Sequence, residues 1–272
     1  MNTTGSLLRI DHDLHVHTYL SDCCTDKARH TPRSILSLAE KMGVRTVGFT
    51  DHVWVNPDIP PSDWYRPQNE TQISRLRQDL GSISSSVRVL VGCESEIIAP
   101  GRFGISRAFA ETLDFVLLPG GHFHMREFVE QPKSDAPRDI GRHLLKFFIS
   151  AASSGLATAI AHPLKPIGFV DRFDQAIGAL SDMELLDAFG VAVEHKVAVE
   201  ITTGFLPSQH MEPFSTETPI RFLSLAREAG CKFTFGTDAH DPKRQRRLPE
   251  LMHFVRTVGI TEEDLSPLVA AA

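Results

Sequence analysis

The chain has 272 residues, of which 42% are hydrophobic, and a formal net charge of −6. This mild charge gives no electrostatic basis for nucleic acid or an anionic membrane as the main partner, and no apolar run approaches the roughly 20 residues that a membrane-spanning helix needs. The sparse cysteines, Cys23, Cys24, Cys93 and Cys231, follow no CxxC or zinc-ribbon spacing and no apolar leader opens the chain, so we expect a cytoplasmic protein with reduced thiols.

An apolar strand followed by an amphipathic helix is the unit that repeats along the chain. We predict strands at residues 11–18, 46–50, 87–97, 115–118, 157–161, 198–202 and 232–236. We predict helices at residues 31–42, 68–81, 105–111, 137–153, 178–194, 218–229 and 247–258. The strands are short and rich in Val, Ile and Phe, which is typical of a parallel sheet covered by helices. Such a regular alternation predicts one α/β domain over residues 1–272, with a barrel as its natural closure.

The first strand carries two histidines on one face. His15 and His17 alternate with Leu14 and Val16, and a period of two places both imidazoles on the same side. Imidazole is an intermediate donor that suits zinc, iron or manganese better than calcium or magnesium. Two solvated histidines at a strand edge would give the same pattern, so the choice depends on whether other strands supply further ligands.

Six of the seven predicted strands end in a residue that can bind a metal, and the chemistry of α/β barrels lies at the carboxyl ends of their strands. These residues are His15 and His17, His52, Glu94, His122 with its rival His124, His162, and Asp238 with His240. Each alone is explained by a helix cap, a turn or a surface imidazole. Together, at one rim, they predict a metal cluster. We assign the remaining histidines to surface or structural positions, namely His12, His30, His143, His195, His210 and His253.

The order of these segments resembles the polymerase and histidinol phosphatase (PHP) superfamily. The matching segments are Leu14-His15-Val16-His17-Thr18, Phe49-Thr50-Asp51-His52, Gly92-Cys93-Glu94, His122, Ile160-Ala161-His162-Pro163 and Gly236-Thr237-Asp238-Ala239-His240. The resemblance implies a distorted (β/α)7 TIM-like barrel with two or three clustered divalent metal ions, of zinc, manganese or iron. It also implies a metal-dependent phosphoesterase activity.

The resemblance further implies how the ligands divide among the metal ions. The first ion would be held by His15, His17, Glu94 and Asp238. The second would be held by Glu94, His122 and His162, which makes Glu94 a bridging carboxylate. A third ion would be held in part by His52 and His240.

Two positions depart from the pattern of this family. Many relatives place a third-metal ligand five or six residues after the second histidine, where this chain has Asp22 and Cys23. A carboxylate suits manganese or iron, whereas a thiolate favours zinc; we favour Asp22. The segment 119–124 carries one additional residue, and we favour His122 over His124 as its ligand.

Clustered cations make hydroxide available near neutral pH and polarise phosphoryl oxygens. No protein nucleophile is evident, because the sequence has no Gly-x-Ser-x-Gly and no activating motif beside Cys23-Cys24. We therefore expect attack of metal-activated hydroxide on a small phosphomonoester such as histidinol phosphate, or on a nucleotide. Asp238 and His240 are the candidates for proton transfer to the leaving alkoxide.

Cationic and aromatic side chains follow several of the predicted strands. Four candidates for binding the non-reacting phosphate oxygens are Arg66, Arg102, Lys165 and Arg244. Solvated loop charges are the alternative for each of them. Three aromatic residues form either a wall over the leaving group or a packed surface loop, and they are Trp54, Trp64 and Tyr65.

Two other functions remain open. Amidohydrolases, which cleave carbon–nitrogen bonds, also begin with His-x-His, but they typically use an eight-stranded barrel and a modified lysine where this chain has a histidine after its fourth strand. A non-catalytic domain, such as those found in some DNA polymerases, is expected within a much longer chain and with a degenerate ligand set. The nearly complete ligand set of this chain favours an enzyme.

Overall fold

A single parallel sheet of seven strands organises the structure. The computed structural model describes residues 8–206 and 213–269. The strands are ordered β1-β2-β3-β6-β7-β8-β9, and every neighbouring pair is parallel. Their bounds are His12–Val16 for β1, Thr46–Phe49 for β2, Arg88–Glu94 for β3, Phe115–Pro119 for β6, Ala159–Ala161 for β7, Ala198–Thr202 for β8 and Phe233–Gly236 for β9. This arrangement matches the seven predicted strands in number and order.

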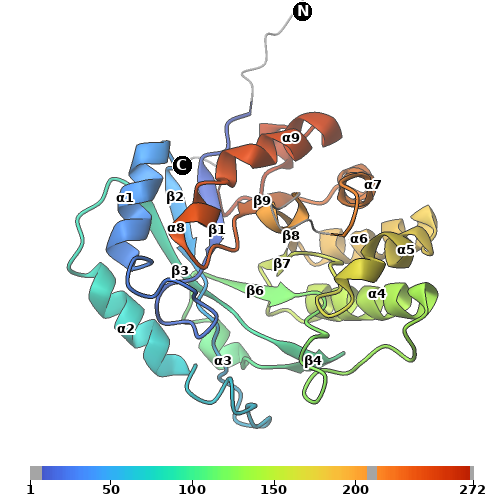
Figure 1. Ribbon diagram of the computed structural model, residues 1–272, viewed down its shortest axis with the longest axis horizontal. Coiled ribbons are helices and arrows are strands. Elements are labelled where there is room, and N and C mark those ends of the chain that lie inside the picture. Colours follow the sequence, from blue (N-terminus) through green and yellow to red (C-terminus); the bar gives the residue numbers. More distant parts are fainter. Residues whose placement is uncertain (1–7, 207–212, 270–272) are drawn as a thin grey trace, which may run out of the picture.

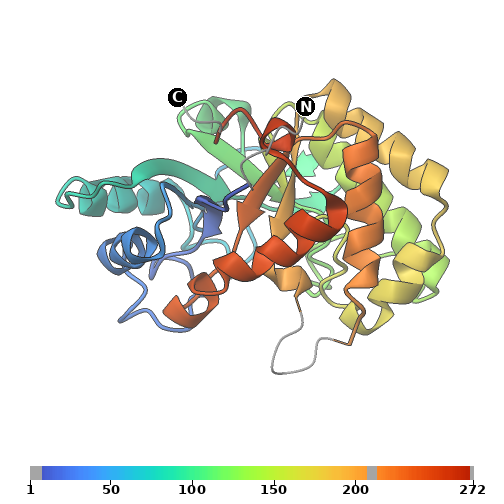
Figure 2. The same ribbon diagram turned by 90° about the horizontal axis from the view of Figure 1, so that it is seen from above.

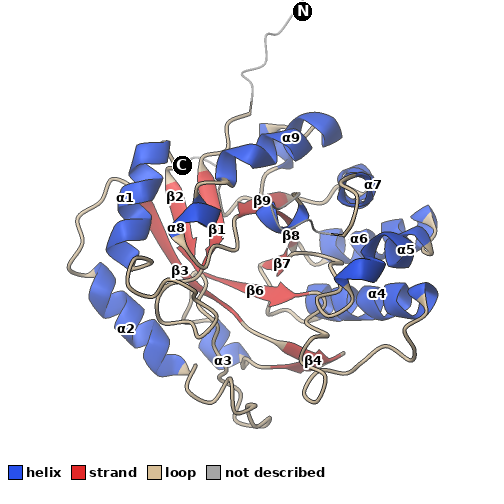
Figure 3. Ribbon diagram, viewed as in Figure 1, coloured by secondary structure: helices blue, strands red, loops and turns tan. Residues whose placement is uncertain are grey.

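The first and last strands meet and nearly close the sheet into a barrel. Val16 and Ala239 form a parallel bridge, in which the Ala239 carbonyl accepts a hydrogen bond of 3.0 Å from the His17 amide. Further down, the Phe235 amide donates to Nε2 of His12 over 3.0 Å. In Figure 3 the strands occupy the centre and the helices surround them. The predicted fold class, an α/β barrel of TIM-like type, is confirmed.

Nine α-helices of the described chain cover the outside of the sheet (Figure 1). They are α1 Pro32–Met42, α2 Glu70–Leu80, α3 Arg107–Ala110, α4 Pro137–Ser153, α5 Phe173–Gly178, α6 Asp182–Glu194, α7 Glu217–Glu228, α8 Pro242–Gln245 and α9 Met252–Val258. Figure 2 shows α7 and α9, in orange and red, on the outside of the last strands. Among the described residues, no helix is long and apolar enough to cross a membrane.

Local sequence signals explain where the helices begin and end. At α1, the Thr31 side chain accepts the Ser34 amide in a capping box, and Gly43 ends the helix with a φ of 71°, a conformation that favours glycine. The helix predicted at 178–194 begins four residues later, at Asp182, and a separate helix that was not predicted, α5, precedes it. Ser181 and Glu184 form a capping box of their own, which starts α6 and separates it from α5.

Two other predicted elements also differ from the structure. The strand predicted at 87–97 ends at Glu94, and β4 (Ile97–Ala99) then pairs with β5 (Arg102–Phe103) as a small antiparallel hairpin. The helix predicted at 247–258 consists of a 3-10 turn, Leu248–Leu251, followed by α9.

The barrel has an apolar interior below a polar rim. A buried apolar cluster includes Leu90 of β3, Leu117 of β6 and Ala198 of β8. Because side chains alternate along a strand, Glu94 lies on the same face of β3 as Leu90, and Glu200 on the same face of β8 as Ala198. The strands therefore direct their ionisable side chains inward toward their carboxyl ends, above a floor of aliphatic and aromatic residues.

Candidate metal centre

The first group of donors gathers at the ends of β1, β3 and β9. Nε2 of His15 lies 3.2 Å from Nε2 of His17, and Oε2 of Glu94 lies 3.3 Å from each of them. Oδ1 of Asp238 lies 3.6 Å from the His15 nitrogen and 3.4 Å from the His17 nitrogen. Donors bound tetrahedrally to one zinc ion at its usual bond lengths are about 3.3 Å apart. The four side chains therefore fit one cation with little movement.

The second group of donors uses the other oxygen of Glu94. Oε1 of Glu94 lies 3.0 Å from Nε2 of His162 and 3.7 Å from Nε2 of His122. The two imidazoles stack with their centroids 5.0 Å apart. Because Oε2 faces the first group and Oε1 the second, Glu94 has the geometry of a bridging carboxylate. His124 is exposed and lies at the edge of this group, with its ring 5.3 Å from that of His122.

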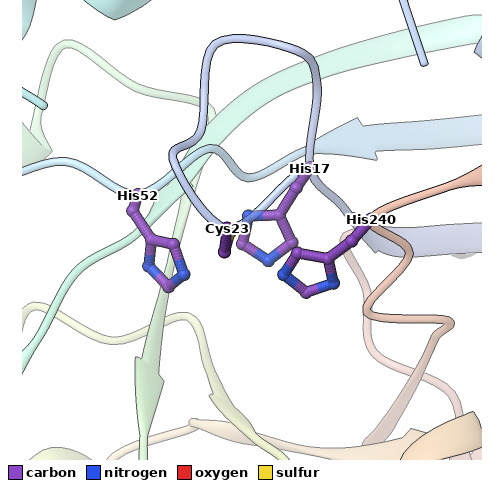
Figure 4. A group of neighbouring side chains, drawn as sticks. All are labelled: His17, Cys23, His52 and His240. Atoms are coloured by element: carbon purple, nitrogen blue, oxygen red, sulfur yellow. The ribbon is translucent and has the colours of Figure 1, made fainter. Parts of the chain in front are cut away.

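The third group of donors contains a thiol. Ligand atoms of His17, Cys23, His52 and His240 all lie within 4.8 Å of one another. Figure 4 shows Cys23 between His52 on one side and His17 and His240 on the other. The favoured candidate Asp22 is not in this group: its side chain is 41% exposed and its carboxylate is paired with Lys27 at 3.2 Å.

The turn that follows His17 explains which of the two neighbours faces the metal centre. The Ser21 hydroxyl donates to the buried carboxylate of Asp51 over 2.7 Å. The Cys24 thiol donates to the carbonyl of His240 over 3.3 Å. Between these two attachments, Cys23 lines the cavity above the donors, whereas the amide of Asp22 donates to the side chain of Gln68.

Two buried carboxylates orient the histidines from behind. Oε1 of Glu200 lies 2.7 Å from Nδ1 of His15, and Oε2 of Glu96 lies 2.8 Å from Nδ1 of His122. Each bond fixes a ring so that its Nε2 faces the donors, as is usual behind metal-bound histidines. Gly236 makes room for one of them, because a Cβ at this position would lie 2.0 Å from Oε1 of Glu200.

The sequence contained a signal for these carboxylates that our predictions did not use. Glu200 stands in the middle of an apolar strand, and Glu96 follows Glu94 by two residues. A charged residue at such a buried position needs a partner, because burying an unpaired charge is costly.

Backbone strain marks two of the donors. His162 has a φ of 30° and Asp238 a φ of 50°, in the left-handed region that side chains other than glycine rarely adopt. The His162 amide donates to Oε2 of Glu200 over 2.5 Å, which holds this conformation in place. Strain of this kind concentrates at functional sites, where the surrounding structure maintains it.

The carboxylates and imidazoles of the centre shift one another's pKa values. Burial lowers the pKa of His15, but Glu200, Glu94 and Asp238 outweigh burial and raise it to about 10. Burial also lowers the pKa of His122, and Glu96 more than reverses this, to about 9. Burial raises the pKa of Glu94, yet the neighbouring His52 and His15 hold it well below its usual range. The centre is thus built to hold positive charge.

A cavity of about 840 Å³ opens above the donors. The loops after β2 and β6 form much of its wall, and their contributions include Trp64, Tyr65, His124, Arg126 and Phe128. Trp64 is 37% exposed, and its ring lies edge-on to that of His52 at 5.2 Å. Arg126 stacks over Phe169, with 5.4 Å between its guanidinium carbon and the ring centroid.

The other two aromatic residues of this loop are buried. The Tyr65 hydroxyl donates to Oε2 of Glu96 over 3.2 Å, so Tyr65 helps to position the carboxylate behind His122. Trp54 packs in the core, and its Nε1 donates to the carbonyl of Ile59.

The four predicted phosphate-binding cations lie in different surroundings. Arg244 is at the metal centre: it donates to Oδ2 of Asp238 over 2.9 Å and to the Thr237 carbonyl over 3.1 Å. Lys165 is buried and donates to the carbonyl of Gly204 over 2.7 Å. Arg66 and Arg102 are exposed and are absent from the described residues that line the cavity.

The remaining described histidines are not part of the three donor groups. His12, His30 and His143 are buried, while His195 and His253 are exposed. His210 lies outside the described residues.

Known proteins resemble this chain in sequence and in fold, although no family model matches it. A probable histidinol-phosphatase of Deinococcus radiodurans is 26% identical over 270 residues, which cover 91% of this chain and 93% of that protein. A probable phosphatase of Syntrophotalea carbinolica is 31% identical over 119 residues, or 44% of each chain. The structure of a histidinol phosphate phosphatase from Lactococcus lactis, complexed with zinc, L-histidinol and phosphate, aligns with a TM-score of 0.56 and 17% identity, over 93% of this chain and 95% of that one.

Buried imidazoles and carboxylates at the carboxyl rim of a parallel barrel define a centre for divalent metal ions, of the kind that metal-dependent hydrolases use. The ordered motifs, the seven-stranded barrel and the phosphatase-named relatives together support the assignment of this chain to the PHP superfamily of phosphoesterases. The enzyme class that they support is a metal-dependent phosphomonoesterase.

Proposed function

We propose that this protein hydrolyses a small phosphomonoester whose alcohol carries an amine, as in histidinol phosphate. One observation carries the proposal: Glu94 lies at the bottom of a large cavity and connects two groups of metal donors through its two oxygens. Such a paired centre suits in-line displacement at phosphorus, where the attacking and leaving oxygens both need stabilisation. The relative in Deinococcus radiodurans, which bears the name of a probable histidinol-phosphatase, supports the same substrate class.

The proposal includes two or three divalent cations, with zinc, manganese and iron as candidates. The donor set fits such ions, since buried imidazole and carboxylate groups are ligands that these metals accept. The first ion would be held by His15, His17, Glu94 and Asp238. The second would be held by Glu94, His122 and His162. When bound, the cations supply Lewis-acid chemistry, polarising phosphoryl oxygens and making water acidic near neutral pH.

The protein contributes orientation and proton transfer around these cations. Glu200 and Glu96 fix the rings of His15 and His122. Asp238 and His240 are the groups that we assign to proton transfer: they would accept the proton that the attacking water loses and pass it to the leaving alkoxide. The side chain of Asp238 stays ionised because Arg244 and the nearby histidines outweigh the effect of burial and hold its pKa well below the usual range.

The walls of the cavity suit an organic leaving group with a positive charge. Trp64 offers an aromatic surface beside His52. We assign Arg126 to the binding of a non-reacting phosphate oxygen, because Arg126 lines the cavity. Arg66 and Arg102 are not among the described residues that line it. Glu127 adds a carboxylate to the same wall, which favours a leaving group that bears an amine.

A substrate panel tests this proposal. The protein is stripped with a chelator, reloaded separately with zinc, manganese or iron, and assayed with L-histidinol phosphate, an alkyl phosphate lacking the amine, a nucleoside monophosphate, a phosphodiester and an amide substrate. We expect metal-dependent release of phosphate, with the highest kcat/KM for L-histidinol phosphate. Equal rates with and without the amine would refute the substrate class. Amide hydrolysis without phosphate release would replace the function by that of an amidohydrolase.

A further inference from the structure

The strands at the closure of the barrel are paired less regularly than the others. The register of β1 against β2 shifts between Asp13 and Val16. Between β1 and β9 the described chain forms one isolated bridge, Val16 with Ala239. By contrast, β8 and β9 pair continuously from Val199 to Thr202. The closure therefore depends on contacts other than a continuous backbone ladder.

Two buried aspartates supply such contacts, and they do so in the same way. Asp13 of β1 accepts the Thr237 amide at Oδ1 over 2.9 Å and the Thr237 hydroxyl at Oδ2 over 2.7 Å. Asp51, after β2, accepts the Thr18 amide at Oδ1 over 2.6 Å and the Thr18 hydroxyl at Oδ2 over 2.7 Å. We call these two bidentate pairs the Asp–Thr clasps. One joins β1 to the end of β9, and the other joins the end of β2 to the end of β1.

Both clasps are shielded from solvent. The two aspartates and the two threonines are each no more than 1% exposed. Asp13 also accepts the His15 amide at 3.4 Å, and Asp51 accepts the Ser21 hydroxyl at 2.7 Å. A buried carboxylate that loses such donors is costly. Because apolar side chains of similar size often replace buried charges without loss of stability, the two aspartates point to a role in orienting the chain.

Each clasp acts on a residue next to a metal donor. Thr237 precedes Asp238, whose φ of 50° lies in the left-handed region, and Thr18 follows His17. The backbone of Thr237 is fixed on both sides, because its amide donates to Asp13 and its carbonyl accepts the Thr203 hydroxyl over 2.7 Å. The first clasp therefore sets where Asp238 begins, and the second sets where the segment after His17 lies.

We propose that Asp13 and Asp51 are positioning residues, which act through Thr237 and Thr18 to hold the ends of β9, β1 and β2 in register before any cation binds. They differ from Glu200 and Glu96, which bond to histidine rings, because the clasps fix backbone. Metal donors must be held within about 0.5 Å of their productive positions, so a loose closure would weaken metal binding. The proposal rests on the proposed function only in requiring a metal centre.

Replacing each threonine by valine tests the clasps, because valine keeps the branched shape and removes the hydroxyl. T237V and T18V are compared with T237S and T18S, which retain a hydroxyl. T234V is the matched control, since Thr234 is a buried threonine of β9 that takes part in neither clasp. Zinc affinity of the chelator-stripped proteins is measured by competition with a metal-sensitive dye. The visible absorption of the cobalt(II)-loaded proteins reports the geometry of the donors.

We expect T237V and T18V each to lower zinc affinity by about 10–100-fold, the range found for groups that orient metal ligands, and to alter the cobalt spectrum. The serine variants should restore most of the affinity, and T234V should match wild type. Thermal unfolding of the metal-free proteins measures stability separately.

Other results would overturn the clasps. A valine variant that loses stability but keeps wild-type zinc affinity and cobalt spectrum would leave its clasp only a structural role. Serine variants as weak as the valine variants would remove the hydroxyl from the device. Weakened zinc binding in the valine variants of a protein that hydrolyses no phosphomonoester would support the clasps and reject the proposed function. Absence of any metal binding by wild type would reject both.

A second measurement on wild type avoids dependence on a variant that folds poorly. Amide hydrogen exchange is followed by nuclear magnetic resonance in the chelator-stripped and the zinc-loaded protein. Because the clasps form without a cation, we expect the amides of Thr18 and Thr237 to be protected in both states. Free exchange of these two amides in the stripped protein, with protection only after zinc is added, would contradict positioning before the cation binds.

Discussion

The first and second groups of donors, which share Glu94 and are called the carboxylate-bridged pair below, lie beside the third group, which contains Cys23, His52 and His240, but the two regions are supported differently. In the pair, His15 and His122 each have a buried glutamate behind the ring, and Glu94 is shared. In the third group, His240 is held by a backbone carbonyl, and Nδ1 of His52, like that of His162 in the pair, has no hydrogen-bond partner among the described residues. Charged hydrogen bonds orient a ligand more strongly than neutral ones. We infer that the pair is the preorganised part of the centre, whereas the third site depends on its cation for order.

The largest expected loss of activity comes from replacing the bridging carboxylate of Glu94. We predict that E94Q lowers kcat/KM by about 10³-fold, equivalent to about 4 kcal/mol, because one substitution removes negative charge from both ions of the pair. Steady-state kinetics on the preferred phosphomonoester, with metal in excess, measures this loss. E111Q changes an exposed glutamate outside the cavity and is the matched control. A loss below about tenfold would show that Glu94 does not bridge.

Removing the supporting carboxylates should weaken the pair without abolishing it. We predict that E200Q and E96Q each lower metal affinity or activity by about 10–100-fold, the usual range for groups behind metal-bound histidines. The reason is that each glutamine keeps the shape but loses the charge that fixes its histidine. Competition with a metal-sensitive dye gives the affinity. If both variants bind the two metal ions of the pair as tightly as wild type does, then Glu200 and Glu96 do not strengthen the pair, and the inferred difference between the two regions is wrong.

The pH dependence of metal binding should follow the pKa values of two histidines in the carboxylate-bridged pair, His15 and His122. The pKa values of His15 and His122, about 10 and 9, lie above the ordinary value, so the metal-free rings retain protons at neutral pH. Their protonated forms stabilise the metal-free fold below about pH 6.5, and this contribution disappears as the pH rises through about 9 to 10. Zinc must displace these protons.

We therefore predict that zinc binding releases protons at pH 7 and that apparent affinity rises as the pH is raised toward 9. Isothermal titration calorimetry in two buffers of different ionisation enthalpy counts the released protons. Identical heats in both buffers would contradict this coupling.

The smallest expected effect lies on the wall of the cavity. We predict that R126A raises KM by about tenfold, or 1.4 kcal/mol, with little change in kcat, because a contact to a non-reacting oxygen contributes to binding in ground and transition states alike. R66A is the matched control and leaves both constants unchanged, since Arg66 is not among the described residues that line the cavity and its guanidinium is paired with the exposed Asp63. A larger effect of R66A than of R126A would reverse our assignment.

Much of the fold followed from sequence because local signals and strand periodicity agree in most units. The capping box at Thr31 and the glycine at 43 delimit α1 as expected. The start of α6 was predicted four residues too early, although the Ser181 capping box marks it, and the six-residue helix α5 before it was not predicted. The β4–β5 hairpin was missed because its five residues were read as the end of a strand and a loop.

The donors could be predicted because each follows a strand, and parallel strands share one rim. The choice between Asp22 and Cys23 could not, because sequence spacing does not say which way a turn directs adjacent side chains. That direction depends on Ser21 and Cys24, whose partners are distant in sequence. Arg126 was missed for a similar reason: its loop turns back over the cavity only in the folded chain.

Metal content, measured side by side in wild type, E94Q and E111Q, tests the central claim that Glu94 bridges two metal ions of this centre. After stripping, reloading with zinc and desalting, the account predicts at least two equivalents in wild type and in E111Q. It predicts loss of the paired ions in E94Q. Equal metal content in all three proteins would contradict the account.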